Sequence, residues 1–125
     1  MQKALLLVFV MLSSQWVFAA DKSKLIGSWE CHLSSESSSY DLQLELNANK
    51  QYSQVWSMLG DKHVEKGVWR TEGSMLVLSR KKYGKNEKEK DSAREFRRGV
   101  VSLSDSELEL RHEASLTKCK KKQKQ

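Results

Sequence analysis

Residues 41–58 read DLQLELNANKQYSQVWSM, and this stretch decides the fold class. Leu42, Leu44 and Leu46 alternate with polar residues, and the alternation resumes at Tyr52 after a short turn-like segment. A period of two places successive side chains on opposite faces of a strand. The stretch therefore predicts two antiparallel strands joined by a turn, each with one apolar and one solvent-exposed face.

The same alternation recurs on both sides of this hairpin. The further alternating segments are Trp29 to Leu33, Val64 to Arg70, Met75 to Arg80, Phe96 to Leu103, Glu107 to His112 and Leu116 to Lys120. About eight short strands at regular spacing are typical of an antiparallel sandwich or barrel. The hairpin-length connections favour an up-and-down meander, and closing it into a barrel removes exposed sheet edges. We therefore expect a small all-β, antiparallel meander barrel.

Helical structure is expected to be minor. Residues 21–26 are compatible with one helical turn before the first strand. Residues 87–97 have a helix-compatible composition, but their apolar positions are too few to define a buried face. The serine-rich segment 34–39 predicts a loop between the first two strands.

Three short motifs follow one another along the chain. They are Leu25-Ile26-Gly27-Ser28-Trp29, Gly67-Val68-Trp69 and Leu103-Ser104-Asp105-Ser106-Glu107-Leu108-Glu109-Leu110. In order and spacing the chain resembles the short secreted lipocalin-like proteins of bacteria, which are of the calycin type. The resemblance spans most of residues 25–112. The chain departs from the pattern in its short length and in lacking an Asp-Gly turn near Asn49.

The resemblance implies a lipocalin-like barrel in which a helical turn leads into the first strand and Trp29 plugs one end. It also implies a basic side chain from a late strand over this indole, and Arg111 is the matching residue. Such a cation–π contact contributes roughly 0.5–2 kcal/mol. The first and last strands pair to close such a barrel, which places Cys31 and Cys119 on neighbouring strands.

The chain contains two cysteines, Cys31 and Cys119. Two cysteines in an exported chain are expected to form a disulfide, and closing so long a loop stabilises by roughly 4–5 kcal/mol in the chain-entropy model. His32 and His112 lie near them in sequence, so a Cys2His2 zinc site is the alternative. We favour the disulfide and expect no metal or other cofactor.

Residues 1–19 have the pattern of a cleaved signal peptide. Lys3 precedes an apolar run over residues 4–12, and Val17 and Ala19 are suitably small for cleavage after Ala19. The run is shorter than the roughly 20 residues of a membrane-spanning helix. We expect a periplasmic or secreted protein with three parts. These are a signal peptide at 1–19, a barrel domain at 20–117 and a basic tail at 118–125.

Catalytic motifs are lacking, and the aromatic residues have two interpretations. The sequence has no nucleophile elbow or phosphate-binding glycine loop, and alternation places the acidic residues on solvent faces, so we do not expect an enzyme. The aromatic side chains either pack in the core or line an apolar pocket. The aromatic set is Trp29, Tyr52, Trp56, Trp69 and Phe96.

Positive charge is concentrated in two stretches of a chain whose formal net charge is +6. Residues 80–90 contain six basic and two acidic residues, and residues 118–124 contain five lysines and no acid. They are either solvated segments or contacts for an anionic partner such as lipopolysaccharide, phospholipid headgroups or an acidic protein. The candidate contacts are Arg80, Lys81, Lys82, Lys85, Lys118, Lys120, Lys121 and Lys122.

Two functional hypotheses follow. The first, implied by the resemblance, is an exported, monomeric, non-enzymatic binding protein for a small apolar or amphipathic ligand. The alternative is an envelope-associated interaction protein or inhibitor that uses the basic loop and tail to bind an anionic partner. Export argues against nucleic acid as a partner, and no transmembrane segment is expected. The position of Trp56 and Trp69, in an open cavity or filling the barrel, separates the two hypotheses.

Overall fold

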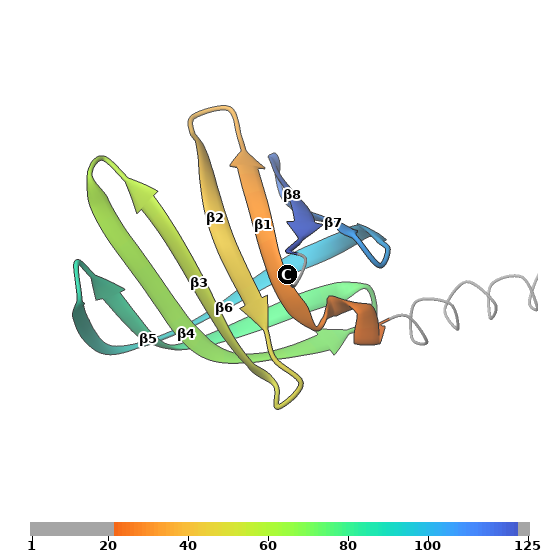
Figure 1. Ribbon diagram of the computed structural model, residues 1–125, viewed down its shortest axis with the longest axis horizontal. Coiled ribbons are helices and arrows are strands. Elements are labelled where there is room, and N and C mark those ends of the chain that lie inside the picture. Colours follow the sequence, from red (N-terminus) through yellow and green to blue (C-terminus); the bar gives the residue numbers. More distant parts are fainter. Residues whose placement is uncertain (1–21, 123–125) are drawn as a thin grey trace, which may run out of the picture.

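The computed structural model describes residues 22–122, which form an antiparallel β-barrel preceded by a short 3-10 helix. The elements are η1 (Lys22–Leu25), β1 (Gly27–Ser34), β2 (Ser39–Leu46), β3 (Gln51–Met58), β4 (Asp61–Glu72), β5 (Met75–Lys85), β6 (Lys88–Leu103), β7 (Glu107–His112) and β8 (Ser115–Lys121). Each strand pairs with the next, and β8 pairs with β1 (Figure 1). The closed eight-stranded meander confirms the predicted fold class. No helix within residues 22–122 is long and apolar enough to cross a membrane.

The alternating leucines of β2 line the interior of the barrel. Leu42, Leu44 and Leu46 of β2 are buried, and the intervening residues are exposed. Across the β1–β2 pair, Trp29 lies opposite Leu44 and Cys31 opposite Leu42, so their side chains enter the same interior. The predicted signal peptide lies outside the described residues.

The turn between β2 and β3, residues 47–50, forms without an Asp-Gly pair. Lys50 has a positive φ of 72°. The Asn47 N–H donates to the Gln51 carbonyl, and the Lys50 N–H donates to the Asn47 carbonyl. Lys50 therefore takes the left-handed conformation that glycine would take in the usual turn.

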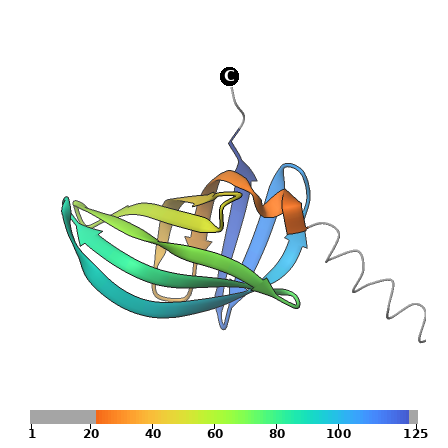
Figure 2. The same ribbon diagram turned by 90° about the horizontal axis from the view of Figure 1, so that it is seen from below.

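The central strands β4, β5 and β6 are longer than the sequence predicted. Residues 80–90 form the end of the β5–β6 hairpin and not a long loop. Of residues 87–97, Glu87 lies in the turn and the others are extended in β6, so the segment is not helical. Charged residues occupy both faces of this hairpin, so its period of two was hidden from a hydrophobicity pattern. Figures 1 and 2 show the hairpins β3–β4 and β5–β6 extending beyond the other strands at one end of the barrel.

A glycine allows β4 and β5 to approach closely where their register shifts. The shift lies between Lys66 and Gly67. A Cβ atom at Gly67 would lie 2.1 Å from the Ser79 carbonyl oxygen, which is far inside contact distance. Gly67 is therefore needed for the β-bulge that redirects the outer part of β5.

A disulfide joins the first and last strands. Cys31 and Cys119 are directly paired across β1 and β8, and their sulfur atoms are bonded, which confirms the predicted link. The cysteines are therefore not thiolate ligands for zinc. Within residues 22–122 no group of three or more His, Cys, Asp and Glu side chains is arranged to hold a metal ion.

The last strand includes much of the predicted tail. β8 continues to Lys121, so Lys118, Lys120 and Lys121 belong to the barrel and not to a tail that begins at residue 118. Their backbone groups pair with β1 and β7, which gives this lysine-rich segment a fixed conformation. Residues 123–125 lie outside the described part of the chain.

Candidate binding site in the barrel

The barrel interior contains Glu65, although strand alternation predicted that the acidic residues face solvent. Glu65 is 3% exposed, whereas Val68 on the same strand is 40% exposed. Trp69 is buried, and Glu65 is four residues before it on β4, so the two side chains share the inward face. The prediction was wrong because β4 carries apolar residues on both faces, and the large indole determines which face is buried.

A group of polar side chains surrounds Glu65 inside the barrel. Gln54 Nε2 donates to Glu65 Oε2 at 2.7 Å. Arg80 Nη1 lies 3.9 Å from Glu65 Oε1, and the Arg80 side chain is itself held by the carbonyl and hydroxyl oxygens of Ser92. Tyr52 and Arg98 complete this set, which we call the interior polar group: Tyr52, Gln54, Glu65, Arg80 and Arg98.

Two buried atoms of the interior polar group, Tyr52 Oη and Glu65 Oε1, make no hydrogen bond of good geometry. They interact with each other, and Glu65 Oε1 also lies 3.9 Å from Arg80 Nη1. Arg98 is half-buried opposite fully buried Leu76. In the described chain its guanidinium makes no hydrogen bond or ion pair. Buried polar atoms are nearly always satisfied in folded proteins, so these weakly satisfied groups are the ones that a polar ligand group or water would stabilise.

Burial and mutual interaction shift the pKa values of these groups. Burial raises the pKa of Glu65 above its usual range, against the opposing effects of Arg80 and Gln54. Burial and the neighbouring Glu65 carboxylate also raise the pKa of Tyr52. Burial lowers the pKa of Arg98, although Tyr40, Glu65 and Tyr52 oppose this shift. The interior is therefore a poorly solvated place for charge, with polar groups that a bound polar atom would stabilise.

Aromatic side chains lie next to the interior polar group, toward the long hairpins. The Trp56 and His63 rings stack with centroids 5.2 Å apart, and His63 Nδ1 is 2.5 Å from Tyr83 Oη. We call Trp56, His63 and Tyr83 the aromatic rim. Arg80 lies 5.3 Å from the Tyr83 ring and 5.5 Å from the Phe96 ring, so it connects the rim to the interior.

The opposite end of the barrel is sealed. Trp29 Nε1 donates to the Leu25 carbonyl of η1 at 2.9 Å, and Trp69 Nε1 donates to the Asn47 carbonyl at 2.9 Å. Leu25 is completely buried, and Trp29 and Trp69 are almost so. Leu44, Leu46, Leu76, Leu78, Leu108 and Leu110 belong to the same buried core.

The cation over Trp29 is a lysine and not the arginine that the resemblance implied. Lys121 Nζ lies 4.9 Å from the centroid of the Trp29 ring and donates to the Lys24 carbonyl. Arg111 is exposed on β7, opposite Gly99 and Leu116. The expectation for Arg111 was wrong because its neighbours Leu108 and Leu110 point inward, which turns residue 111 outward.

The five aromatic candidates divide between two environments. Trp29, Tyr52 and Trp69 are buried, whereas Trp56 and Phe96 are partly buried and pack against the edge of the core. Sequence reasoning did not identify His63, Tyr83, Glu65 and Arg98, which lie with them. For Glu65 the signal was its spacing of four from Trp69. His63, Tyr83 and Arg98 gave no such signal, because the sequence did not define the outer ends and faces of β4, β5 and β6.

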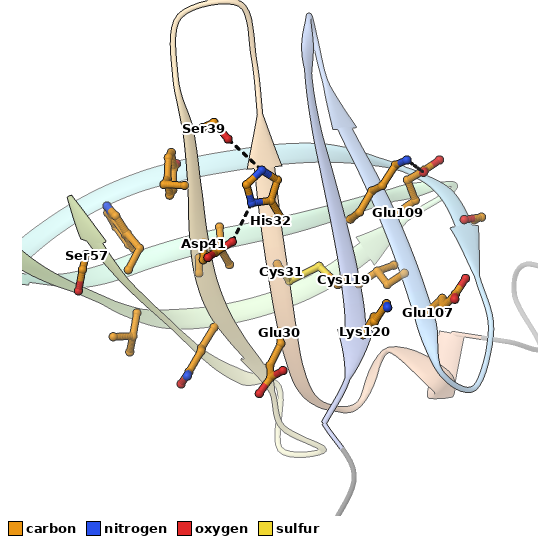
Figure 3. A pocket seen from close by; sticks show the side chains of 18 of the residues that line it. Glu30, Cys31, His32, Ser39, Asp41, Ser57, Glu107, Glu109, Cys119 and Lys120 are labelled. Carbon is orange, nitrogen blue, oxygen red and sulfur yellow. Dashed lines mark hydrogen bonds and ion pairs between the residues drawn. A yellow bond between two sulfur atoms is a disulfide. The ribbon is translucent and has the colours of Figure 1, made fainter. Parts of the chain in front are cut away.

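A hollow also lies on the outside of β7, β8, β1, β2 and β3 (Figure 3). There Ser39 Oγ is 2.8 Å from His32 Nε2, and His32 Nδ1 is 2.7 Å from Asp41 Oδ1. The order resembles a serine-hydrolase triad, but the three side chains are exposed on a hairpin in water. Catalysis by such a triad depends on a water-poor site with preorganised oxyanion donors. We therefore interpret the contacts as fastening the open end of the β1–β2 hairpin.

The eight basic residues proposed to contact an anionic partner are dispersed. Arg80 points inward, Lys121 covers Trp29, and Lys85 pairs with Asp61 at 3.3 Å. The outward residues Lys118 and Lys120 lie beside acidic residues of neighbouring strands, including Glu109. The remaining candidates, Lys81, Lys82 and Lys122, are exposed.

Comparison with known proteins supports the fold. The barrel matches the crystal structure of a lipocalin-like protein from Bacteroides uniformis with a TM-score of 0.57, covering 78% of this chain and 98% of that protein. The sequences are 13% identical, so the match establishes a lipocalin-like fold. No protein-family model matches the sequence. No curated protein matches it at a significant level.

Proposed function

We propose that this protein is a non-enzymatic binding protein that holds a small amphipathic molecule at the end of the barrel bearing the aromatic rim. The observation that carries the proposal is the interior polar group, in which Tyr52 Oη and Glu65 Oε1 are buried without a hydrogen bond of good geometry, in a barrel whose other end is sealed. A ligand with a polar atom would satisfy them, while its apolar part would contact Trp56 and Phe96.

The lipocalin-like fold is compatible with this proposal but does not specify a function. Lipocalin-like barrels are typically binders of small ligands, but a fold hosts many functions, so the argument rests on the interior polar group. The Cys31–Cys119 disulfide supports the further proposal that the protein works in an oxidising compartment, the periplasm or the exterior.

Titration with a neutral, environment-sensitive dye, N-phenyl-1-naphthylamine, tests the proposed function. We expect saturable fluorescence enhancement with one dye per chain. The Trp56→Ala variant should bind several-fold more weakly, because Trp56 supplies apolar surface at the rim. Val101→Ala is the control, since Val101 is 51% exposed and is not among the residues that pack against the core. Absence of saturable binding, or equal binding by Trp56→Ala, contradicts the proposal.

A further inference from the structure

A row of cations runs along the inward face of β6. By strand alternation Lys88, Lys90, Arg94 and Arg98 lie on the same face as Phe96, which packs against the core. The register agrees, because Lys90 is opposite Tyr83 of the aromatic rim and Arg94 is opposite Arg80. Lys88 and Lys90 are two residues apart, roughly 7 Å along a strand, and the other successive members are four residues apart, roughly 13 Å. We call these four residues the β6 cation row.

The β6 cation row is not neutralised by acidic residues on the inward face. Among the inward positions of the described strands, the acidic residues are Asp61 and Glu65. Asp61 already contacts Lys85 and accepts from Asn86 Nδ2 at 2.8 Å. Glu65 already contacts Gln54 and Arg80. No member of the row has an ion-pair partner within residues 22–122.

The outward face of the same strands shows the opposite arrangement. Lys66 Nζ lies 3.5 Å from Glu89, and Arg70 and Arg97 form a network of ion pairs with Glu72 and Glu95. Lys66, Arg70 and Arg97 on the outward face are therefore paired with acids, whereas the four members of the β6 cation row are not. Such a separation of charge makes the inward face attract anions specifically.

Aromatic surface lies beside these cations. Arg94 is 5.0 Å from the Phe96 ring, and Arg80 lies between the Phe96 and Tyr83 rings. Trp56 stacks with His63, which is opposite Lys85 at the end of the β5–β6 hairpin. A ligand that contacts both kinds of surface has an apolar part and a negative charge.

We infer that the ligand of this barrel is an anionic amphiphile, whose phosphate or carboxylate group binds the β6 cation row while its apolar part lies against the aromatic rim and Phe96. This inference rests on the proposed function and specifies the class of ligand. It places the anionic group at Lys88 and Lys90, in the outer part of the long hairpin, and the apolar part along the aromatic rim and Phe96.

Competition against the neutral dye tests the inference, with each amphiphile kept below its micelle concentration. Dodecyl phosphate and dodecylphosphocholine share a chain and a phosphate, but the second has no net charge. We expect dodecyl phosphate to bind about tenfold more tightly at low salt, with a preference that shrinks as ionic strength rises. Inorganic phosphate at the same concentration should not displace the dye, and displacement by it would overturn the amphiphile assignment.

Two double variants with the same change of charge locate the effect. Lys88→Glu/Lys90→Glu reverses two charges on the inward face of the hairpin. Lys81→Glu/Lys82→Glu reverses two charges at the β5 bulge of the same hairpin, where Lys82 lies opposite outward Lys66, and all four lysines are exposed. We expect the first to abolish the preference for dodecyl phosphate and the second to retain it. Equal losses in both variants would assign the preference to net charge and overturn the inference.

The outcomes also separate this inference from the proposed function. If the wild-type protein binds the dye and both amphiphiles equally well, the proposed function stands and the anionic ligand class is wrong. If the dye and both amphiphiles fail to bind, both proposals are wrong.

Discussion

The two ends of the barrel use tryptophan in different ways. At the sealed end, Trp29 and Trp69 are buried and their indole N–H groups donate to backbone carbonyls. At the other end, Trp56 is partly buried and stacks on His63. A tryptophan whose N–H donates to a backbone carbonyl can be fully buried and close the end of a small barrel. A tryptophan without such an acceptor stays partly exposed, where its ring can contact a ligand.

The cations at the two ends also have different surroundings. Lys121 and Lys50 lie over the Trp29 and Trp69 rings, and Lys121 also donates to the Lys24 carbonyl. These lysines complete the seal. The β6 cation row, at the other end, has no acidic partner in the described chain. Stability should therefore depend on the sealed end, and binding on the end with the long hairpins.

Alanine substitution of the two tryptophans should have the largest and most unequal effect. Trp29→Ala should lower the free energy of unfolding by about 3–5 kcal/mol, because it removes a large buried side chain and leaves a cavity. Trp56→Ala should cost about 1 kcal/mol, since its ring is partly exposed. Chemical denaturation of both variants measures the difference. Equal losses would contradict the distinction between the two ends.

Removal of the disulfide should produce the next largest effect. Cys31→Ala/Cys119→Ala should lower the free energy of unfolding by about 2–5 kcal/mol, because the link between β1 and β8 closes most of the chain into one loop. Reduction of the wild-type protein serves as the control and should cause a similar loss. A double variant as stable as the wild type would mean that strand pairing alone holds the seam.

The buried carboxyl group should give stability a distinctive pH dependence. Because burial raises the pKa of Glu65 in the folded state, the folded protein binds more protons than the unfolded protein above the ordinary Glu pKa. Its contribution to stability should therefore decrease as pH rises from the unfolded pKa through the folded pKa. Denaturation across this window should show a smaller decrease for Glu65→Gln. Parallel wild-type and variant profiles would show that Glu65 is well solvated.

The smallest expected effect distinguishes two cations. Lys121→Met should destabilise by about 0.5–1 kcal/mol, because it removes the cation over Trp29. Arg111→Met should change stability by less than about 0.5 kcal/mol, since Arg111 is exposed. Thermal denaturation of the pair measures this. A larger loss for Arg111→Met would restore the arginine that the sequence resemblance suggested.

Much of the barrel was predictable because its strands have a clear inner and outer face. The leucines of β2 gave both the strand and its orientation, and the motif around Trp29 gave the closing strand and plug. The cysteine pair was predicted from the expected export, and the family resemblance implied that the two cysteines lie on neighbouring strands. These features depend on local patterns or on one pairing between chain ends.

The candidate site was harder to predict because it depends on strands whose patterns are ambiguous. β4 has valines outside and Glu65 inside, and the outer part of β6 is charged on both faces. Only the register across β4, β5 and β6 shows that Lys88, Lys90 and Tyr83 share a face. The bulge at Lys81 of β5, opposite residues 66–67, shifts that register, and no sequence period reports it.

Binding at the end that bears the aromatic rim can be checked from the indole resonances of a 15N-labelled sample of residues 20–125. Trp29, Trp56 and Trp69 each give one Nε1–H signal, and they sample the two ends of the barrel. Titration with dodecyl phosphate should shift the Trp56 signal and leave the Trp29 and Trp69 signals in place, because the latter N–H groups are bonded to Leu25 and Asn47. Shifts of Trp29 and Trp69 with an unchanged Trp56 would place binding at the sealed end and contradict the account.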